Sequence, residues 1–346
     1  TKIGAGYIAD RLGHCKALVV IGYGLTPLGQ IAIALALGWP MILLGRAVGW
    51  LGKGIRGPLR DAIVAEAITP ETRGRAFGFH RAADTLGAVV GPLLGVASLA
   101  WSQSLHLADQ SQAFRLVFWL AIVPGVLSML SFALFVRDDE SRPNPALRFW
   151  ASVGRFPAAF RRYLVAVGIF GVGDFSHALL ILAATELLTP SMGVLHAAQI
   201  AAALYIARNV MQTIASYPVG FAADRIGHRT VLLFGYALGV VVAVLVVLAF
   251  AFRLESLWLL GGIFSLAGLY VAVQEALEPS LTAGLVPDEV RGIAYGCLGS
   301  VNGVGKLASS AAVGFLWTAV SPAAGFGTAA ALMAIGTIAL TRVRAS

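Results

Sequence analysis

GYIADRLGH at residues 6–14 returns almost unchanged as GFAADRIGH at residues 220–228. Each copy follows the end of an apolar stretch, and each is followed by another apolar stretch that contains a Gly-Tyr pair. A soluble protein has little reason to place the same Asp-Arg turn between hydrophobic segments twice. The repeat therefore indicates an internally duplicated membrane protein with two related halves.

The composition also points to a membrane protein. Apolar residues make up 58% of the 346 residues and charged residues 12%, whereas soluble domains are roughly half apolar and about a quarter charged. Residues 17–37 and 230–252 contain no charged side chain, and each is long enough to cross a bilayer as a helix, which takes roughly 20 residues. Cys15 and Cys297 show no CxxC spacing, so the sequence predicts no disulfide framework, no metal site and no cofactor.

Apolar runs separated by charged residues or by Pro and Gly predict an all-α membrane protein. A short opening stub leads into the first turn, and a series of full helices follows it. We predict these helices at residues 17–37, 40–62, 76–101, 113–136, 164–188, 199–222, 230–252, 258–281, 292–317 and 325–341.

The connections between these helices alternate in charge. Lys and Arg occur on every second connection, and Arg253 alone departs from the alternation. No Lys or Arg occurs in the opposite connections, which are residues 38–39, 102–112, 189–198 and 318–324. The positive-inside rule places the basic connections and the C-terminus in the cytoplasm, so we expect a multi-pass protein of a bacterial inner membrane. The net charge of +8 is dispersed over separate connections, which argues against nucleic acid as a partner.

The longest polar stretch divides the chain. We predict an N-terminal bundle at residues 1–136, a cytoplasmic central loop at 137–163 and a C-terminal bundle at 164–346. Aromatic side chains lie among the arginines of the loop, a pattern typical of a segment on the membrane face.

A second repeat supports the duplication. RGRAFG at residues 73–78 corresponds to RGIAYG at residues 291–296, and Pro followed by an acidic residue precedes both. Continuing the alignment at the same offset matches Asp84 with Asn302 and Gly87 with Gly305. Two matched segments in the same order make chance an unsatisfactory explanation.

The GxxxDRxG turn, the number of helices and the basic central loop together resemble the Major Facilitator Superfamily. This resemblance implies twelve helices in two pseudo-symmetric six-helix bundles, with the turn between helices two and three and again between helices eight and nine. On that register residues 1–9 are the end of helix two. We therefore expect helix one and most of helix two to lie upstream of Thr1. The resemblance also implies a monomeric secondary transporter whose partners are a small-molecule substrate and the lipid bilayer.

The predicted helix at 76–101 carries a glycine motif formed by Gly87, Gly91, Pro92 and Gly95. It resembles a motif of proton-coupled exporters, and it would also serve as a glycine face for close helix packing with a Pro bend. The stretch GKGIRGPLRDA at residues 52–62 resembles a subgroup of bacterial permeases.

The sequence shows no enzyme motif in a context that would support enzyme activity. GKGIRG at residues 52–57 matches a dinucleotide-binding fingerprint in letters only, because it lies inside a predicted membrane helix and no strand precedes it. Neither GxSxG, HExxH nor a Walker A sequence occurs. The sequence therefore predicts that the chain is not an enzyme.

Placing ionisable groups at membrane depth costs free energy, so such groups are candidates for a functional role. The candidates for proton coupling or for the substrate cavity are Asp174, His177, Arg208, Arg46, Asp84, Asn302 and Lys306. We expect Asp174 near the midplane of the helix at 164–188, with His177 one turn further on the same face and Arg208 as a neighbour. The alternative is a purely structural Asp174–Arg208 ion pair. For Glu275 and Glu278 we expect pairing with arginines of the cytoplasmic loops.

The repeated turns are predicted gates. Asp10 and Asp224 are expected to accept N–H groups at the helix starts near Gly292 and Gly74, which carry partial positive charge. The adjacent basic residues are Arg11 and Arg225, and the turn glycines that allow sharp turns and close approach are Gly6, Gly13, Gly220 and Gly227.

The favoured function is proton-coupled efflux of a small solute by alternating access, with protons as the second partner. Two alternatives stay open. One is an uptake permease for a small polar or anionic solute, suggested by interior cations that include Arg46, Lys53, Arg208 and Lys306. The other is a non-transporting membrane sensor or a lipid-handling protein.

Overall fold

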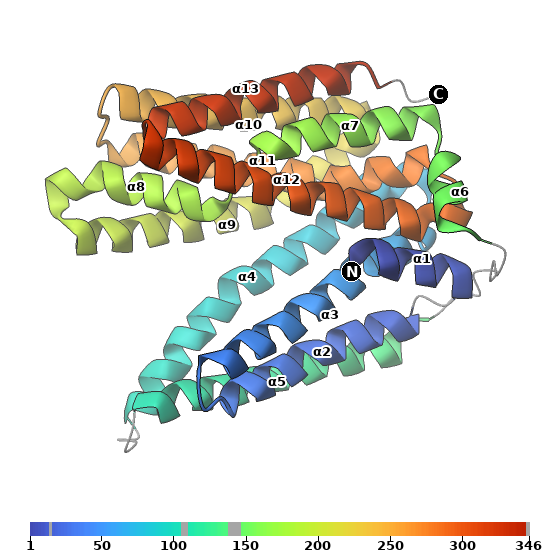
Figure 1. Cartoon of the computed structure of the whole chain (residues 1–346), viewed down its shortest axis with the longest axis horizontal. Helices are drawn as coiled ribbons and strands as arrows, with labels where there is room; N and C mark the ends of the chain where they lie inside the picture. The colour runs from blue at the N-terminus through green and yellow to red at the C-terminus, as the bar shows by residue number, and fades with distance from the viewer. Residues whose placement is uncertain (14–15, 105–109, 138–146, 344–346) are drawn as a thin grey trace. The chain divides into compact units, whose positions relative to one another are not determined.

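A computed structural model describes residues 1–13, 16–104, 110–137 and 147–343, and within these ranges the chain forms helices and no strands. The predicted all-α fold is confirmed. The helices are α1 Lys2–Leu12, α2 Lys16–Ala34, α3 Trp39–Glu66, η1 Pro70–Thr72, α4 Arg73–Ser104, α5 Gln110–Phe135, α6 Phe149–Gly154, α7 Ala158–Gly173, α8 His177–Met192, α9 Val194–Ile226, α10 His228–Ala251, α11 Leu257–Leu285, η2 Asp288–Val290, α12 Arg291–Ala319 and α13 Pro322–Thr341 (Figure 1).

The chain divides into two compact units. Unit 1 comprises Thr1–Ala67, Val90–Arg155 and Pro287–Gly299, and unit 2 comprises Ile68–Val89, Phe156–Val286 and Ser300–Ser346. In unit 1, α2 packs against α3 and α5, and α1 packs against α3. In unit 2, α9 packs against α8 and α11, while α13 packs against α7 and α10. Helices α4 and α12 contribute residues to both units. The division into bundles at residues 1–136 and 164–346 stays a prediction.

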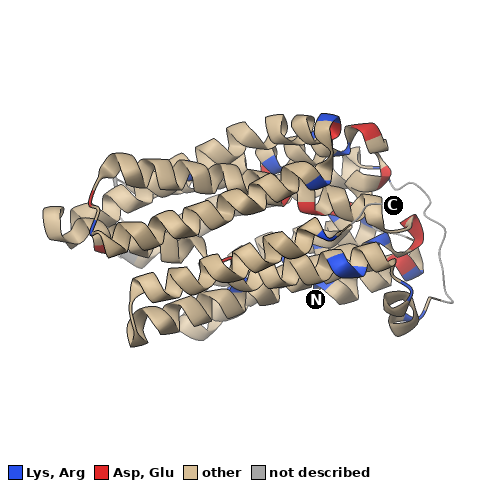
Figure 2. Cartoon of the chain, turned by 90° about the horizontal axis from the view of Figure 1, so that it is seen from above, with Lys and Arg blue, Asp and Glu red and all other residues tan. Residues whose placement is uncertain are grey.

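Eight segments of the described chain are long and apolar enough to cross a membrane. They coincide with α2, α4, α5, the pair α7 and α8, α9, α10, α11 and α13. Helices α3 and α12 are of similar length and carry more polar residues, among them Arg46 and Lys53 on α3 and Lys306 on α12. Long stretches of helix carry no charge of either sign (Figure 2). The chain is a multi-pass membrane protein.

Local sequence sets several helix starts. Ser256 and Ser321 cap α11 and α13, because their hydroxyl oxygens accept the N–H groups of Leu259 and Ala324. Pro40 stands in the first turn of α3, where a proline has no N–H to leave unpaired. These signals fix where the membrane helices begin and therefore which residues reach their centres.

The predicted continuous helix at 164–188 is wrong. Helix α7 ends at Gly173 and α8 begins at His177, so Asp174 and His177 do not lie on one helix face. Glycine lowers helix propensity at Gly171 and Gly173, and Asp and Ser compete with helical hydrogen bonds. The hydroxyl oxygen of Ser176 accepts the N–H of Ala178 at 3.3 Å and so starts a new helix.

The predicted central loop contains a short helix, α6, that the sequence did not predict. Residues 138–146 of this loop, like Cys15 in the first turn, lie outside the described residues. Within unit 1 the loop attaches to α1, because the Tyr7 hydroxyl donates to the Leu147 carbonyl at 3.2 Å and the Tyr7 ring meets Phe149 edge-on. A position on the membrane face stays a prediction.

Candidate functional site

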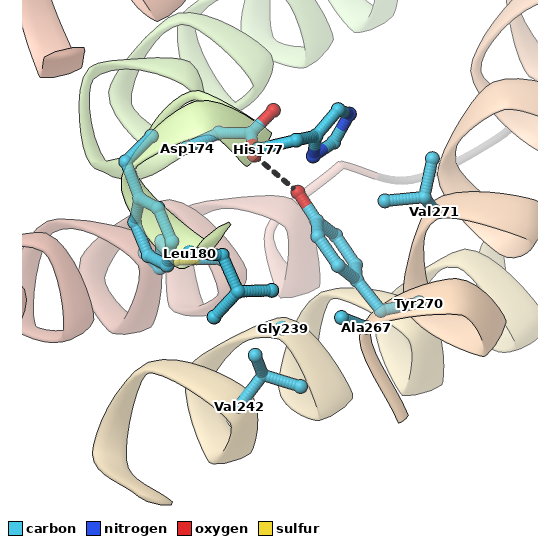
Figure 3. A pocket seen from close by; sticks show the side chains of 10 residues that line it. Asp174, His177, Leu180, Gly239, Val242, Ala267, Tyr270 and Val271 are labelled. Carbon is cyan, nitrogen blue, oxygen red and sulfur yellow. Dashed lines mark hydrogen bonds between the residues drawn. The ribbon is translucent and has the colours of Figure 1, made fainter. Parts of the chain in front are cut away.

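The break between α7 and α8 holds a buried carboxylate. Asp174 is 3% exposed and lies near the middle of the candidate span Ala158–Met192. Its Oδ1 accepts the Tyr270 hydroxyl at 2.7 Å, as Figure 3 shows. Its Oδ2 accepts the Gln274 amide at 3.3 Å and forms an ion pair with Lys306 Nζ at 3.2 Å. An ionised Asp174 is therefore well compensated.

Arg208 does not take the place that the sequence predicted for it. Its Nη1 donates to Asn209 Oδ1 at 2.5 Å and its Nη2 donates to His177 Nε2 at 3.2 Å. Within the described residues, Lys306 and not Arg208 is the counter-ion of Asp174. The predicted Asp174–Arg208 pair is wrong: Lys306 on α12 pairs with Asp174, and Arg208 on α9 bonds to His177 at the start of α8.

A second buried carboxylate lies in the same unit. Glu278 is 3% exposed, and it accepts the Tyr236 hydroxyl at 2.6 Å and the Asn302 amide at 2.5 Å. Glu275 accepts the Gln212 amide at 2.9 Å. The prediction that these two carboxylates pair with loop arginines is wrong.

The residue spacing on α11 and α12 could have predicted this cluster of buried polar side chains. Tyr270, Gln274 and Glu278 are spaced by four residues on α11, which places them on one helix face. Asn302, Lys306 and Ser310 have the same spacing on α12. The two polar stripes meet at Asp174 and Glu278.

Two cavities adjoin the break. The larger, about 320 Å³, is lined by Phe175, Ser176, His177, Lys306, Leu307 and Ser310. The smaller, about 20 Å³, is lined by Asp174 and His177 together with mostly apolar side chains and Tyr270 (Figure 3). Unit 2 thus brings Asp174, His177, Arg208, Asn302 and Lys306 together.

The remaining predicted coupling residues lie elsewhere. Arg46 is exposed on α3 in unit 1. The side chain of Asp84 is 51% exposed and forms an ion pair with Arg81 at 3.9 Å. At Gly87, Gly91 and Gly95 an added Cβ would have no heavy atom of the described chain within 4 Å. The role of this glycine motif stays a prediction.

The two repeated turns make equivalent contacts, one in each unit. Asp10 accepts the N–H groups of Gly292 and Ile293 at 2.9 and 2.7 Å. Asp224 accepts those of Gly74 and Arg75 at 2.6 and 3.1 Å, and it also pairs with the Arg75 side chain at 3.1 Å. Each carboxylate therefore holds a helix N-terminus, of α12 and of α4 respectively, where the helix dipole favours negative charge.

Glycine makes these contacts possible. A Cβ at Gly6 would collide with the Gly292 carbonyl oxygen, and one at Gly220 would collide with the Gly74 carbonyl oxygen. Gly13 and Gly227 have φ of 69° and 97°, a region that favours glycine. The neighbouring arginines bond locally: Arg11 donates to the Tyr7 hydroxyl, and Arg225 lies over the Phe221 ring.

The Asp10 contact is expected to weaken as pH rises. Asp10 lies in the last turn of α1, outside the candidate membrane spans. Burial raises the pKa of its carboxyl from 3.8 to about 7, with Glu66 adding to the shift and the two N–H donors and Arg291 opposing it. The joined state therefore binds a proton more tightly than an exposed carboxyl does. The stabilisation of the contact by this proton is complete below pH 3.8, the pKa of an exposed carboxyl, and is lost as pH rises through about 7.

This pH dependence can be read from Cys297, a partly buried thiol on α12. In a Cys15→Ser background, N-ethylmaleimide labelling of Cys297 should rise between about pH 6 and about pH 8 more steeply than in Asp10→Asn. Dividing by the rate in Asp10→Asn removes the ordinary pH dependence of thiol chemistry. Parallel pH curves for the two proteins would refute the expectation.

These features define a class: an all-helical, multi-pass membrane protein with duplicated interhelical turns and buried ionisable groups inside its spans. A family model described as Major Facilitator Superfamily matches residues 1–205 and 164–346. The chain belongs to the Major Facilitator Superfamily, a family of secondary transporters.

Individual comparisons agree with this assignment. The chain is 30% identical over 322 residues to an MFS-type transporter of Methanocaldococcus jannaschii, covering 92% of this chain and 75% of the relative. It is 29% identical over 343 residues to a probable 4-methylmuconolactone transporter of Cupriavidus pinatubonensis, covering 94% and 73%. A double-tryptophan mutant of XylE has a TM-score of 0.78 at 15% identity, covering 100% of this chain and 83% of XylE.

Proposed function

We propose that this secondary transporter is coupled to protons through Asp174, with Lys306 as the cation that Asp174 releases when it is protonated. The observation that carries the proposal is the ion pair at 3.2 Å between Asp174, which is buried in the middle of an interrupted membrane helix, and the partly exposed Lys306. Charged groups at this membrane depth are energetically costly, so their presence indicates a functional role. Protonation of Asp174 removes its negative charge and leaves Lys306 available to another anion.

The charge of the substrate then decides the mode of coupling. A cationic solute would compete with the proton for Asp174, which gives exchange, and this mode fits the efflux predicted from the glycine motif on α4. An anionic solute would take Lys306 from a protonated Asp174, so that proton and solute bind together, which gives cotransport and uptake. The specific observation that favours this second candidate is a cavity of about 320 Å³ lined by Lys306.

We further propose that Asp10 and Asp224 act as gates on the cytoplasmic side. In this proposal they stabilise the state in which α1 is joined to α12 and α9 to α4. The contacts of both carboxylates with helix N-termini support the role. A monomer in a bacterial inner membrane, with a cytoplasmic C-terminus, completes the proposal and rests on the basic connections.

The test is proton movement in proteoliposomes that contain the purified full chain and an internal pH dye. Anionic, neutral and cationic solutes of similar size are added outside in turn. We expect one charge class to move protons across the membrane, inward with the solute for cotransport. No proton movement with any charge class, while unlabelled solute still drives counterflow, would contradict proton coupling.

A further inference from the structure

The polar lining of the larger cavity consists of hydrogen-bond donors. Of the six residues that line it, four are polar, namely Ser176, His177, Lys306 and Ser310, and none carries a carboxylate. A lysine ammonium group donates only. The Ser176 and Ser310 oxygens already accept the N–H groups of Ala178 and Ser176, respectively, so each hydroxyl hydrogen remains to be donated.

The tautomer of His177 follows from its partner. Arg208 approaches His177 Nε2 at 3.2 Å, and a guanidinium group has donors and no acceptor. Nε2 therefore accepts, and the ring proton of a neutral His177 lies on Nδ1. The imidazole of His177, which lines the cavity, thus offers a donor from Nδ1.

A second cation lies directly behind His177. Arg208 is 3% exposed, its Nε has no hydrogen-bond partner, and it makes no ion pair with a carboxylate in the described part of the chain. A buried guanidinium without a carboxylate partner is costly, and an anion near His177 would offset that cost. The cavity thus lies beside two cations, Lys306 and Arg208.

The rest of the lining is apolar. Phe175 and Leu307 complete the wall, and about 320 Å³ lies within the range of small-molecule sites, roughly 300–1,000 Å³. We propose that this cavity binds a small organic acid, with its carboxylate on Lys306, His177 and the two serine hydroxyls and its apolar body against Phe175 and Leu307. This proposal rests on the proposed function and names its substrate class.

Binding of such an acid should bring a proton with it. When the Lys306 ammonium turns from Asp174 Oδ2 to the substrate carboxylate, Asp174 loses its counter-ion and takes a proton from water. Tyr270, Gln274 and Lys306 contact Asp174, and the other charged or titratable groups of this cluster are His177, Arg208, Glu275 and Glu278. Anion and proton then cross together without net charge.

The test uses the purified full chain in detergent and three acids, benzoate, phenylacetate and isovalerate, each paired with its neutral amide. We expect at least one acid to raise the unfolding temperature where its amide does not. In weakly buffered solution the same acid should cause proton uptake by the wild type and none by Asp174→Asn. Inorganic phosphate tests whether any anion suffices.

Variants locate the binding. Lys306→Gln should weaken binding of the acid at least about tenfold, as expected for loss of a charged hydrogen-bond partner, and Lys306→Arg should restore part of it. Arg208→Gln should also weaken binding. Arg253→Gln, which removes an exposed cation of the same unit, should bind as the wild type does. Restoration by Lys306→Arg excludes simple misfolding as the cause.

The outcomes separate the two proposals. If no acid binds better than its amide, or if phosphate binds equally well, the organic-acid site is refuted, even where another solute moves protons through Asp174. If an acid binds at Lys306 but Asp174→Asn takes up as many protons as the wild type, the substrate class stands and the coupling role of Asp174 is refuted.

Discussion

Asp174→Asn is expected to abolish accumulation driven by a pH gradient while counterflow of labelled solute without a gradient continues. The amide has nearly the shape of the carboxyl and still accepts the Tyr270 hydroxyl, which lies 2.7 Å from Oδ1 in the wild type. It carries neither a removable proton nor a charge to hold Lys306. The transporter can therefore alternate between its states without binding a proton, so the gradient no longer drives the solute.

The measurement compares uptake into proteoliposomes with and without an imposed pH gradient, for a solute that moves protons in the wild type. Glu255→Gln, which neutralises an exposed carboxylate between α10 and α11, should remain coupled. If Asp174→Asn still concentrates the solute against its gradient, the proton binds elsewhere. Glu278 then becomes the next candidate, because it is buried whereas Asp84 is half exposed.

Gly6→Ala is expected to break the contact between α1 and α12, although the added group is a single methyl. The carbon of that methyl would collide with the Gly292 carbonyl oxygen, so the two backbones have to separate. Separation also removes the bonds from Gly292 and Ile293 to Asp10 and the bond from Lys2 Nζ to the Gly299 carbonyl. Labelling of Cys297 by N-ethylmaleimide in the Cys15→Ser background should rise several-fold.

Gly4→Ala is the matched control, since it lies on the same helix and an added Cβ there meets no atom within 4 Å. The substitution should leave labelling unchanged, because alanine is the better helix former. Equal labelling of Cys297 in Gly6→Ala and Gly4→Ala would show that the close approach at Gly6 does not protect this end of α12.

The sequence predicted the all-α membrane fold because each span is long and apolar enough to be recognised by itself. It also predicted that the turn aspartates lie against the helix starts near Gly292 and Gly74, because the internal duplication supplied both partners. Their role as gates, like the role of each coupling residue, stays a prediction.

The composition of the ionisable cluster was harder to predict. Apolar periodicity continues across Asp174, so the break between α7 and α8 was missed, although Gly171, Gly173 and Ser176 are helix-ending and helix-starting signals. The partner of Asp174 depends on how α12 is rotated about its axis, which a single helix does not reveal. Counting residues from a span's end gave depth alone, so Lys306 was found as a candidate and not as the counter-ion.

The interruption between α7 and α8 also has a mechanical consequence. Asp174 directly follows the last residue of α7, whereas His177 begins α8, and the short link between them lacks a continuous ladder of helical hydrogen bonds. The N–H of Ser176 in this link donates to the Ser310 hydroxyl on α12 at 3.1 Å. Because a break of this kind can act as a hinge, we expect α8 to move separately from α7, which would reshape the wall that carries His177 while Asp174 stays with α7.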